Sequence, residues 1–597
     1  MRLSTRTRAI AVLAAAGASL AGVGATGAVA AAHDVRVIVQ ADSVSAARAA
    51  VTAVGGRTST GLPIVSGVAA RIPADARSAL AAQPGVVAVT PDRPVAVSGT
   101  ADGTTISGTP SVFRHEVGAD TLATTGDTGK GAVVALIDTG VTPGPDLTGR
   151  LVTGLANPTS QLGPPVDCIN FSGESTCADN YGHGTFMAGL IAGNGAQSGG
   201  SSAQGSDGCP TTLGMFAGVA PCARIVSIKI AGADGSSDVT KLLAAIQWVV
   251  SFKDTYGISV LNLSLGTDSA ASASVDPLNR AVERAWQSGL AVVVAAGNIG
   301  PKSGTIMKPG DDPLVITAGA ADDRGTPAVS DDRTPDFTSR GPTITDGLAK
   351  PDVVAPGGHI IGLQAPGSAI SKIPTEADLQ SPNYNGAYRR GSGTSMSTAI
   401  TSGVAALVWS QWSQQPGFDP TTWPDRLKFA LTATAQKVSL SDPSAVGAGL
   451  VNAFAAVNAP AGLANRAVGA LSDGSGTLDN SRNDLRVFTS CTLPTAQQCA
   501  VAGQQTAQGR IYFGQQYAQG AWTASSWYAS QFAGQSWEAT SWASNACPRN
   551  GATAGACAQG QSWEGQSWEG QSWESSDDPS ASYGTPIVGS ASYGAWG

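Results

Sequence analysis

The segment AVVALI at residues 132–137 is the first of five short, mostly apolar runs along the middle of the chain. The others are RIVSIKI (224–230), ISVLNLS (258–264), LAVVVAAG (290–297) and LVITAGA (314–320). Continuous runs of Val, Ile and Leu of this length are typical of strands that are covered on both faces. The five runs therefore predict a buried sheet.

Helical patterns separate these runs. In residues 238–253 five apolar side chains fall on one helical face, and Ser236 or Ser237 is the expected N-cap. The five are Leu242, Ala245, Ile246, Val249 and Val250. Strands that alternate with helices predict an α/β fold, with a parallel sheet and helices on both faces. In such sheets functional residues gather at the carboxyl ends of the strands.

The two ends of the chain differ from this central region. Residues 1–30 combine a basic start with a weakly apolar run ending in Ala28-Val29-Ala30, which is typical of a signal peptide and predicts secretion. A membrane anchor is the alternative, although the run is rich in Ala and Gly and poor in Leu and Ile. Residues 33–99 carry a strand–helix pattern that predicts a small antiparallel sheet with two helices on one face. Residues 461–597 are rich in Gln, Ser, Gly and Trp, with the repeat GQSWE, and are typical of a low-complexity extension.

Charge and cysteine content narrow the class of protein. The chain has 597 residues and a net charge of −8 without a basic block, which argues against nucleic acid as a partner. Eight cysteines fit an exported protein, and none has the C-x-x-C spacing of a zinc site. We assign neighbouring cysteines as disulfides, although the sequence alone leaves the connectivity open. The pairs are Cys168 with Cys177, Cys209 with Cys222, Cys491 with Cys499, and Cys547 with Cys557.

Ser395 lies in GSGTSMSTAI, at the start of an apolar run that has the pattern of a buried helix. It is either a helix cap or a nucleophile, and a nucleophile needs a base. The chain offers four histidines for that role: His33, His115, His183 and His359. His183 is the strongest candidate because glycines flank it in YGHGT and let other backbone approach its ring.

Asp138 is the candidate for the residue that orients His183, since it ends the first buried run in ALIDTGV. Each of these residues alone could be structural, but each lies in a separate glycine-containing motif. No histidine follows Ser395, so the order Ser…Asp…His of the α/β-hydrolases is excluded. The order in this chain is Asp…His…Ser.

Three blocks, ALIDTGV, GHGTFMAG and GTSMSTAITSGVAAL, resemble the signature blocks of subtilisin-like serine peptidases, and KPDVVAPG (350–357) is similar to a further block. The resemblance covers residues 110–458. It implies a triad with Ser395 as nucleophile, His183 as general base and Asp138 as its orienting carboxylate. It also implies that Asn298 and the backbone N–H of Ser395 form an oxyanion hole, although Asn298 alone could be a turn residue.

The resemblance further implies a pocket for the substrate residue before the scissile bond. Its edges are small, which favours apolar or aromatic substrate side chains there; they are Ser264, Leu265, Gly266, Ala295, Ala296 and Gly297. Residues 33–99 resemble the inhibitory, folding-assisting prosegment of the family. The chemistry itself requires no cofactor.

Some positions depart from relatives of this kind. Many relatives have a second histidine where this chain has Phe186, but that residue is not the base. Sedolisins are relatives with a Ser-Glu-Asp triad. They carry Asp where this chain has Asn298, and they do not use a histidine at the position of His183, so the sequence argues against that group. Asp146 lies one residue away from the spacing of a calcium ligand in some relatives, so structural calcium stays open, without an identified ligand set. The pairs Asp311-Asp312 and Asp331-Asp332 are interpreted as surface turns.

The sequence as a whole predicts a secreted, monomeric serine endopeptidase that cleaves proteins or peptides and is made as a self-processing precursor. An inactive relative that only binds would carry a substituted triad residue, and none is substituted. The remaining alternative is an adhesive protein whose Trp-rich extension contacts cell wall or glycan, with a peptidase domain that serves only processing.

Overall fold

The computed structural model describes residues 34–92, 94–97, 111–158, 164–267, 271–372, 386–438, 442–466, 468, 471–475, 489–490 and 498–499. The expected signal peptide and the GQSWE repeats lie outside these residues. So do most of residues 97–112, whose small, polar composition predicts a flexible linker. Within the described part, none of the helices has the length and apolar character needed to cross a bilayer.

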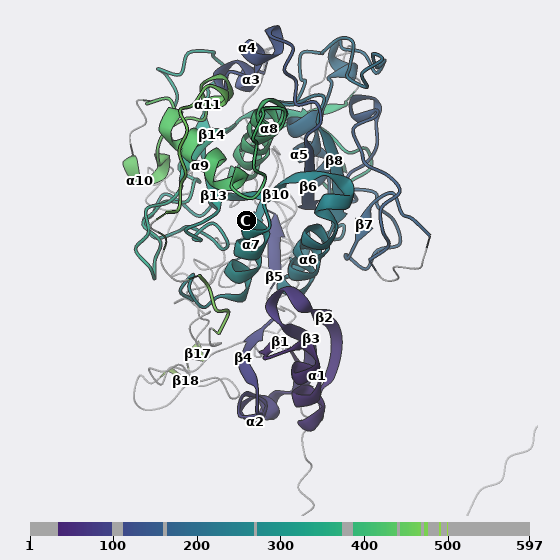
Figure 1. Ribbon diagram of the computed structural model, residues 1–597, viewed down its shortest axis with the longest axis vertical. Helices are drawn as coiled ribbons and strands as arrows, with labels where there is room; N and C mark the ends of the chain where they lie inside the picture. The colour runs from purple at the N-terminus through teal and green to yellow at the C-terminus, as the bar shows by residue number, and fades with distance from the viewer. Residues whose placement is uncertain are drawn as a thin grey trace, which may run out of the picture.

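A seven-stranded parallel sheet forms the centre of the molecule, in the order β14-β13-β12-β10-β6-β8-β7 (Figure 1). The strands are β6 (Val133–Asp138), β7 (Ile169–Asn170), β8 (Arg224–Lys229), β10 (Ile258–Leu263), β12 (Ala291–Ala295), β13 (Ile316–Asp322) and β14 (Val353–Gly358). Five of them coincide with the apolar runs, and every residue of β6, β10 and β12 is buried. The predicted α/β fold is confirmed.

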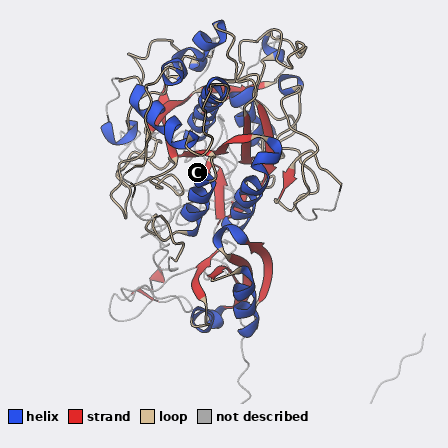
Figure 2. Cartoon of the chain, in the orientation of Figure 1, coloured by secondary structure: helices blue, strands red, loops and turns tan. Residues whose placement is uncertain are grey.

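Helices cover both faces of this sheet (Figure 2). On one face α5 (His183–Ala192) packs against α8 (Thr394–Trp412), and on the other α6 (Val239–Tyr256) packs against α7 (Pro277–Gln287). Small and apolar residues make up most of α8, and all but two of its positions are buried. The start of α8, with Ser395, therefore lies inside the domain.

The N-terminal unit is a four-stranded antiparallel sheet in the order β2-β3-β1-β4. Its elements are β1 (Asp34–Ala41), α1 (Val44–Ala53), β2 (Arg57–Leu62), β3 (Gly67–Pro73), α2 (Arg77–Ala81) and β4 (Val86–Pro91). Val37 and Val39 of β1 pack under the two helices, whereas Ile38 belongs to the main core. Because successive residues of a strand face opposite sides, the second face of this sheet packs on α6 and α7.

A further strand from the N-terminal unit, β5 (Pro94–Val97), reaches into the central domain. It lies antiparallel between β9 (Ser236–Asp238) and β11 (Leu265–Gly266). Val97 pairs with Leu265, and Val95 pairs with Ser237. The N-terminal unit thus completes a three-stranded sheet of which the central domain supplies both edges.

The predicted cap of α6 is wrong. Ser236 and Ser237 are extended in β9, where they pair with β5, and Asp238 caps the helix by accepting a hydrogen bond from the N–H of Lys241 at 2.9 Å. Aspartate is as good an N-cap as serine. The apolar pattern therefore predicted the helix but not the residue at which it begins.

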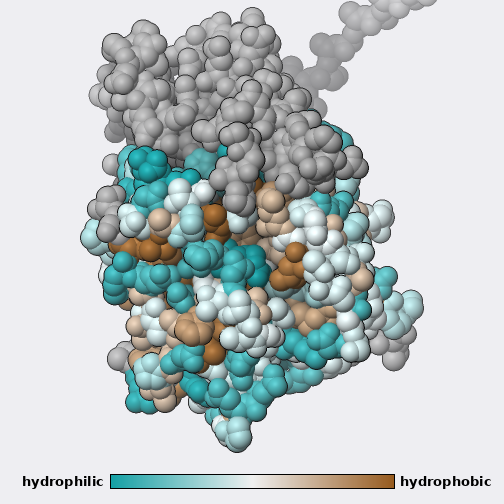
Figure 3. All heavy atoms as spheres, turned by 90° about the horizontal axis from the view of Figure 1, so that it is seen from above, coloured by the Kyte–Doolittle hydropathy of each residue, from teal (hydrophilic) through white to brown (hydrophobic). Residues whose placement is uncertain are grey.

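The remaining α-helices and strands lie outside the seven-stranded sheet. They are α3 (Phe113–Glu116), α4 (Ala119–Thr124), α9 (Trp423–Thr434), α10 (Pro443–Val446), α11 (Ala453–Val457), β15 (Ile360–Leu363), β16 (Tyr388–Gly391), β17 (Thr489–Ser490) and β18 (Gln498–Cys499). Packing continues beyond Pro460, because Asn465 donates to Asp425 at 2.9 Å and the N–H of Ser472 donates to Glu283 at 2.8 Å. On the face seen in Figure 3, apolar residues form small patches among hydrophilic ones.

Candidate active site

The ends of three adjacent strands carry the residues that the sequence singled out. Asp138 is the last residue of β6, Ser264 follows β10, and Asn298 follows β12. These strands are parallel neighbours in the sheet, so their carboxyl ends meet at one edge.

His183 and Asp138 form a buried pair at this edge. The Nδ1 of His183 lies 2.8 Å from Oδ1 of Asp138, and the two side chains are 0% and 1% exposed. The same oxygen accepts the N–H of Thr139 at 2.7 Å. A carboxylate only accepts hydrogen bonds, so Nδ1 of His183 carries the proton and Nε2 is the basic nitrogen.

Thr139 ties the segment after Asp138 to the turn before His183. Its hydroxyl donates to Oδ1 of Asp179 at 2.7 Å and accepts the N–H of Gly184 at 2.8 Å. Asp179 also accepts the N–H groups of Gly182 and Thr185, at 2.6 and 2.7 Å. Neither residue was predicted from the sequence, although Thr139 lies within ALIDTGV and Asp179 lies three residues before GHGTFMAG.

Ser395 is buried as the second residue of α8. Its hydroxyl donates to the carbonyl of Ser264 at 3.0 Å, and the hydroxyl of Ser264 donates to the carbonyl of Ser395 at 3.0 Å. The N–H of a second helical residue has no acceptor within its own helix, and the helix dipole adds positive potential there. The surroundings of Ser395 therefore favour negative charge.

Asn298 is held by the residue that precedes Ser395. Its Oδ1 accepts both the N–H and the hydroxyl of Thr394, each at 2.9 Å, which fixes the orientation of the amide. The side chain is 1% exposed, and its Nδ2 has no hydrogen-bond partner among the residues that the structure describes. A buried hydrogen-bond donor without an acceptor lowers the stability of the fold. Such a donor is expected where a substrate oxygen becomes its acceptor during the reaction. Thr394 was missed in the sequence, although it stands next to the candidate nucleophile.

Two other candidate histidines lie elsewhere in the fold, His115 on a helix and His359 between β14 and β15. His115 is part of α3. His359 places Nδ1 3.0 Å from Oδ1 of Asp322, and burial, with Arg390 nearby, lowers the pKa of His359 to about 4. His33 lies outside the described residues.

The two segments expected to edge the substrate pocket are neighbours, because β10 pairs with β12. Met307 packs between them: a Cβ added to Gly266 would lie 3.1 Å from Cβ of Met307, and one added to Gly297 would lie 2.7 Å from its sulfur. Met307 is 2% exposed. The side chain of Met307 makes the expected substrate pocket smaller than the small residues at its edges suggest. Met307 lies in none of the sequence motifs.

The interpretation of the aspartate pairs as surface turns is wrong for Asp311, Asp312 and Asp332, which are 6%, 0% and 6% exposed. Asp311 accepts hydrogen bonds from Lys308 and Asn279. Burial raises the pKa of Asp312 to about 6, against the opposing charge of a nearby lysine. Lys308 is only three residues before Asp311, but Asn279 comes from α7, and the sequence did not show that this side chain lies beside Asp311.

The surroundings of Asp146 do not fit the calcium ion that the sequence left open. Its Oδ1 accepts the N–H of Gln197 at 2.9 Å, and its Oδ2 accepts the hydroxyl of Tyr388. Both oxygens thus serve protein donors. Within the described ranges, no group of three or more Asp, Glu, His or Cys side chains is arranged to hold a metal ion.

Two of the assigned disulfides are formed, Cys168–Cys177 before α5 and Cys209–Cys222 after it. Each closes a short loop, of 9 and 13 residues in sequence separation. The other two assigned pairs, Cys491 with Cys499 and Cys547 with Cys557, fall wholly or partly outside the described residues.

The sequence profile of the subtilase family matches residues 129–463. The serine protease AprX of Bacillus subtilis is 38% identical over 331 residues, which make up 55% of this chain and 66% of AprX. M-protease of Shouchella clausii is 29% identical over 331 residues, 55% of this chain and 65% of M-protease. Among solved structures, fervidolysin from Fervidobacterium pennivorans, a keratinolytic enzyme related to subtilisin, is similar with a TM-score of 0.54 at 22% identity.

The fervidolysin match covers 72% of this chain and 62% of fervidolysin, and it concerns the fold. The chain therefore spans less than two thirds of the length of each of these three relatives.

Proposed function

The chain belongs to the subtilase family, and from that premise we propose that it is a secreted serine endopeptidase made as a self-processing precursor. The observation that carries the proposal is the buried Asp138–His183 pair, which lies at the same sheet edge as Ser395 and Asn298. Nδ2 of Asn298 is a buried donor without a partner within the described part of the chain. The printed names of AprX and M-protease, both proteases, support the same class of reaction.

The proposed chemistry assigns one task to each residue. Ser395 Oγ attacks the scissile carbonyl while Nε2 of His183 removes its proton and then delivers it to the leaving amine. Asp138 holds the tautomer of His183 and stabilises its charged form. Asn298 Nδ2 and the N–H of Ser395 donate to the oxyanion. Water then hydrolyses the acyl-enzyme on Ser395 by the same route.

The proposed substrate site is the space between β9 and β11. Strand β5 pairs there with both neighbours through backbone bonds, which is the way an extended substrate segment would bind. Apolar side chains are the proposed preference at the residue before the scissile bond, because Gly266, Gly297 and Met307 surround that space.

Residues 33–99 are proposed to inhibit the enzyme until export. Their sheet packs on α6 and α7, and β5 fills the proposed substrate site. Asp92 strengthens the contact, because its Oδ1 accepts the N–H of Thr240 at 2.8 Å at the start of α6. A segment bound in this way has to be cut and removed before substrates bind.

Maturation tests the proposal. Ser395→Ala is expected to accumulate at the mass that retains residues 33–99, because cleavage in the linker at 97–112 needs Ser395. The unmutated protein is expected to lose that segment. Mass spectrometry and N-terminal sequencing of both proteins, secreted from a host without other extracellular proteases, give the answer. Trimming of Ser395→Ala at the same bond and rate would assign processing to another protease.

A second test shortens the C-terminal extension. The residues after Pro460 that pack on the central domain decide where the chain is truncated. Truncation after Ser475 is expected to leave cleavage of small peptides and the thermal midpoint largely unchanged. Truncation after Pro460 removes the contacts of Asn465 and Ser472, each worth about 1 kcal/mol net, and is expected to lower the midpoint. Calorimetry and peptide kinetics on both proteins check this. Equal midpoints would mean that residues 461–475 contribute nothing to the fold.

A further inference from the structure

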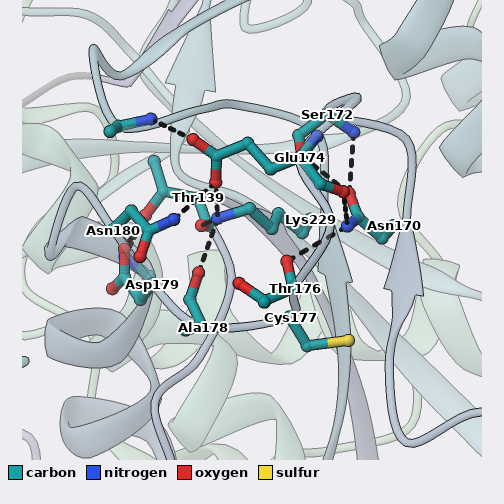
Figure 4. Close-up of polar contacts among 12 residues, drawn as sticks. Thr139, Asn170, Ser172, Glu174, Thr176, Cys177, Ala178, Asp179, Asn180 and Lys229 are labelled. Carbon is teal, nitrogen blue, oxygen red and sulfur yellow. Dashed lines mark hydrogen bonds and ion pairs between the residues drawn. The ribbon is translucent and has the colours of Figure 1, made fainter.

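Lys229 is a buried lysine one strand away from the candidate triad. It ends β8, and in the sheet register it pairs with Asp138 at the end of β6. Its side chain is 0% exposed. The ammonium group donates to the carbonyl of Thr139 at 2.8 Å and to the carbonyl of Ala178 at 2.6 Å (Figure 4).

These two carbonyls belong to the segments that carry the Asp138–His183 pair. Thr139 directly follows Asp138, and Ala178 begins the turn that leads into His183. The segments approach closely at Gly140, which has a φ of +104°, and a Cβ there would lie 2.8 Å from the carbonyl of Cys177. Lys229 therefore joins both segments through their backbone carbonyls.

The third proton of the ammonium group goes to Glu174, whose Oε2 lies 3.0 Å from Nζ. The same oxygen accepts Nδ2 of Asn180 at 2.8 Å, and Oε1 accepts the N–H of Ala233 at 2.9 Å. Partial burial would raise the pKa of Glu174, but the hydrogen bonds from Lys229, Ala233 and Asn180 hold that pKa below its ordinary value. The carboxylate is therefore charged at neutral pH.

Glu174 extends the connection to the proposed substrate site. Ala233 lies in the loop before β9, the strand that pairs with β5. On its other side, Glu174 is held in the loop closed by Cys168–Cys177, where Nδ2 of Asn170 donates to the carbonyl of Glu174 at 2.9 Å (Figure 4). One ion pair thus links the Asp138 segment, the His183 turn and the substrate-side strand.

We propose that Lys229 and Glu174 are positioning residues, which set the Asp138–His183 geometry and align β9 with it. The proposal rests on the proposed peptidase function, because its kinetic consequence is expressed in peptide cleavage. Among the described residues, the side-chain hydrogen bonds and ion pairs of Lys229 and Glu174 go to none of the reacting atoms. Both act by fixing the backbone around residues that do.

Lys229→Met tests whether Lys229 sets the Asp138–His183 geometry, because it keeps the length of the side chain and removes the ammonium group. We expect kcat to fall by about 10- to 100-fold with little change in KM, since a misplacement of about 1 Å in a catalytic group has an effect of that size. Lys350→Met is the matched control: Lys350 is also buried and bonds to Val315, Thr317 and Asp352, away from the triad. Both are measured well below their unfolding midpoints, and the control is expected to keep its kcat.

Glu174 supplies a milder pair of variants in case Lys229→Met does not fold. Glu174→Ala is expected to lower kcat and also to raise KM, each by several-fold to about 10-fold, because β9 loses its anchor at Ala233. Glu174→Gln keeps an oxygen acceptor and is expected to restore most of both values. Failure of Glu174→Gln to differ from Glu174→Ala would contradict the positioning role of the carboxylate.

A spectroscopic readout separates this proposal from the peptidase function. The Nδ1–H of His183, bonded to Asp138, is followed by proton NMR in histidine-labelled protein. Its resonance is expected to shift or broaden in Lys229→Met and Glu174→Ala, and to stay in place in Lys350→Met. If the unmutated protein cleaves no peptide, the proposed function fails and this resonance alone decides the positioning role. An unchanged resonance and unchanged kcat in Lys229→Met, with only a lower midpoint, would overturn the proposal.

Discussion

Replacing Ser395 or His183 by alanine is expected to lower kcat by about 10⁶, a magnitude carried over from subtilisin, because the triad acts as a unit. Without Ser395 the proposed nucleophile is missing, and without His183 the proposed general base is missing. Removing both is expected to cost little more than removing one. Residual cleavage would come from substrate binding and the oxyanion hole. The measurement is single-turnover and steady-state cleavage of a chromogenic peptide by protein freed of residues 33–99.

Ser397→Ala is the matched control for Ser395→Ala. Ser397 lies on the same buried helix, and its hydroxyl donates to the carbonyl of Ala355 at 3.0 Å rather than into the candidate site. Its loss is expected to lower the unfolding free energy by about 1 kcal/mol and to leave kcat in place. Near-normal cleavage by a clean Ser395→Ala preparation would remove Ser395 from the mechanism.

Asn298→Leu is expected to lower kcat by about 10² to 10³ with little change in KM, again as in subtilisin, because its Nδ2 acts on charge that develops only in the transition state. The geometry supports this, since the bonds from Thr394 use Oδ1 and leave Nδ2 as the buried donor. The kinetics are measured with the same chromogenic peptide.

Thr394→Ser is the informative companion to Asn298→Leu. It keeps the hydroxyl that donates to Oδ1 of Asn298, so activity is expected to be largely retained, whereas Thr394→Val is expected to lower kcat. If Asn298→Leu mainly raised KM, the amide would be a residue for substrate binding in the ground state.

The sequence predicted the central sheet well because burial on both faces leaves uninterrupted apolar runs such as β6 and β12. Short or polar elements left no such pattern. The β2 segment RTSTGL has little alternation, and β9 is a strand only because β5, from a distant part of the chain, pairs with it.

In the candidate site too, some residues could be predicted from the sequence and others could not. Asp138, His183, Ser395 and Asn298 stand in motifs that could be compared with a known family. The residues that hold them, Thr394 and Lys229 among them, act through contacts between distant segments. Lys229 is one cation at the end of an apolar run, and only the folded chain brings it to Thr139 and Ala178.

The pairing of β5 with β9 and β11 has a consequence for what the enzyme would digest. Those contacts are made between backbones, so they test whether a chain can lie fully extended and hardly test its sequence. A segment that is paired within a folded protein has to open locally before it can lie extended in this site, whereas a denatured chain meets no such cost. A site of this kind would cleave unfolded chains in preference to folded ones. Folded proteins in the medium, including the enzyme itself, would be cleaved slowly.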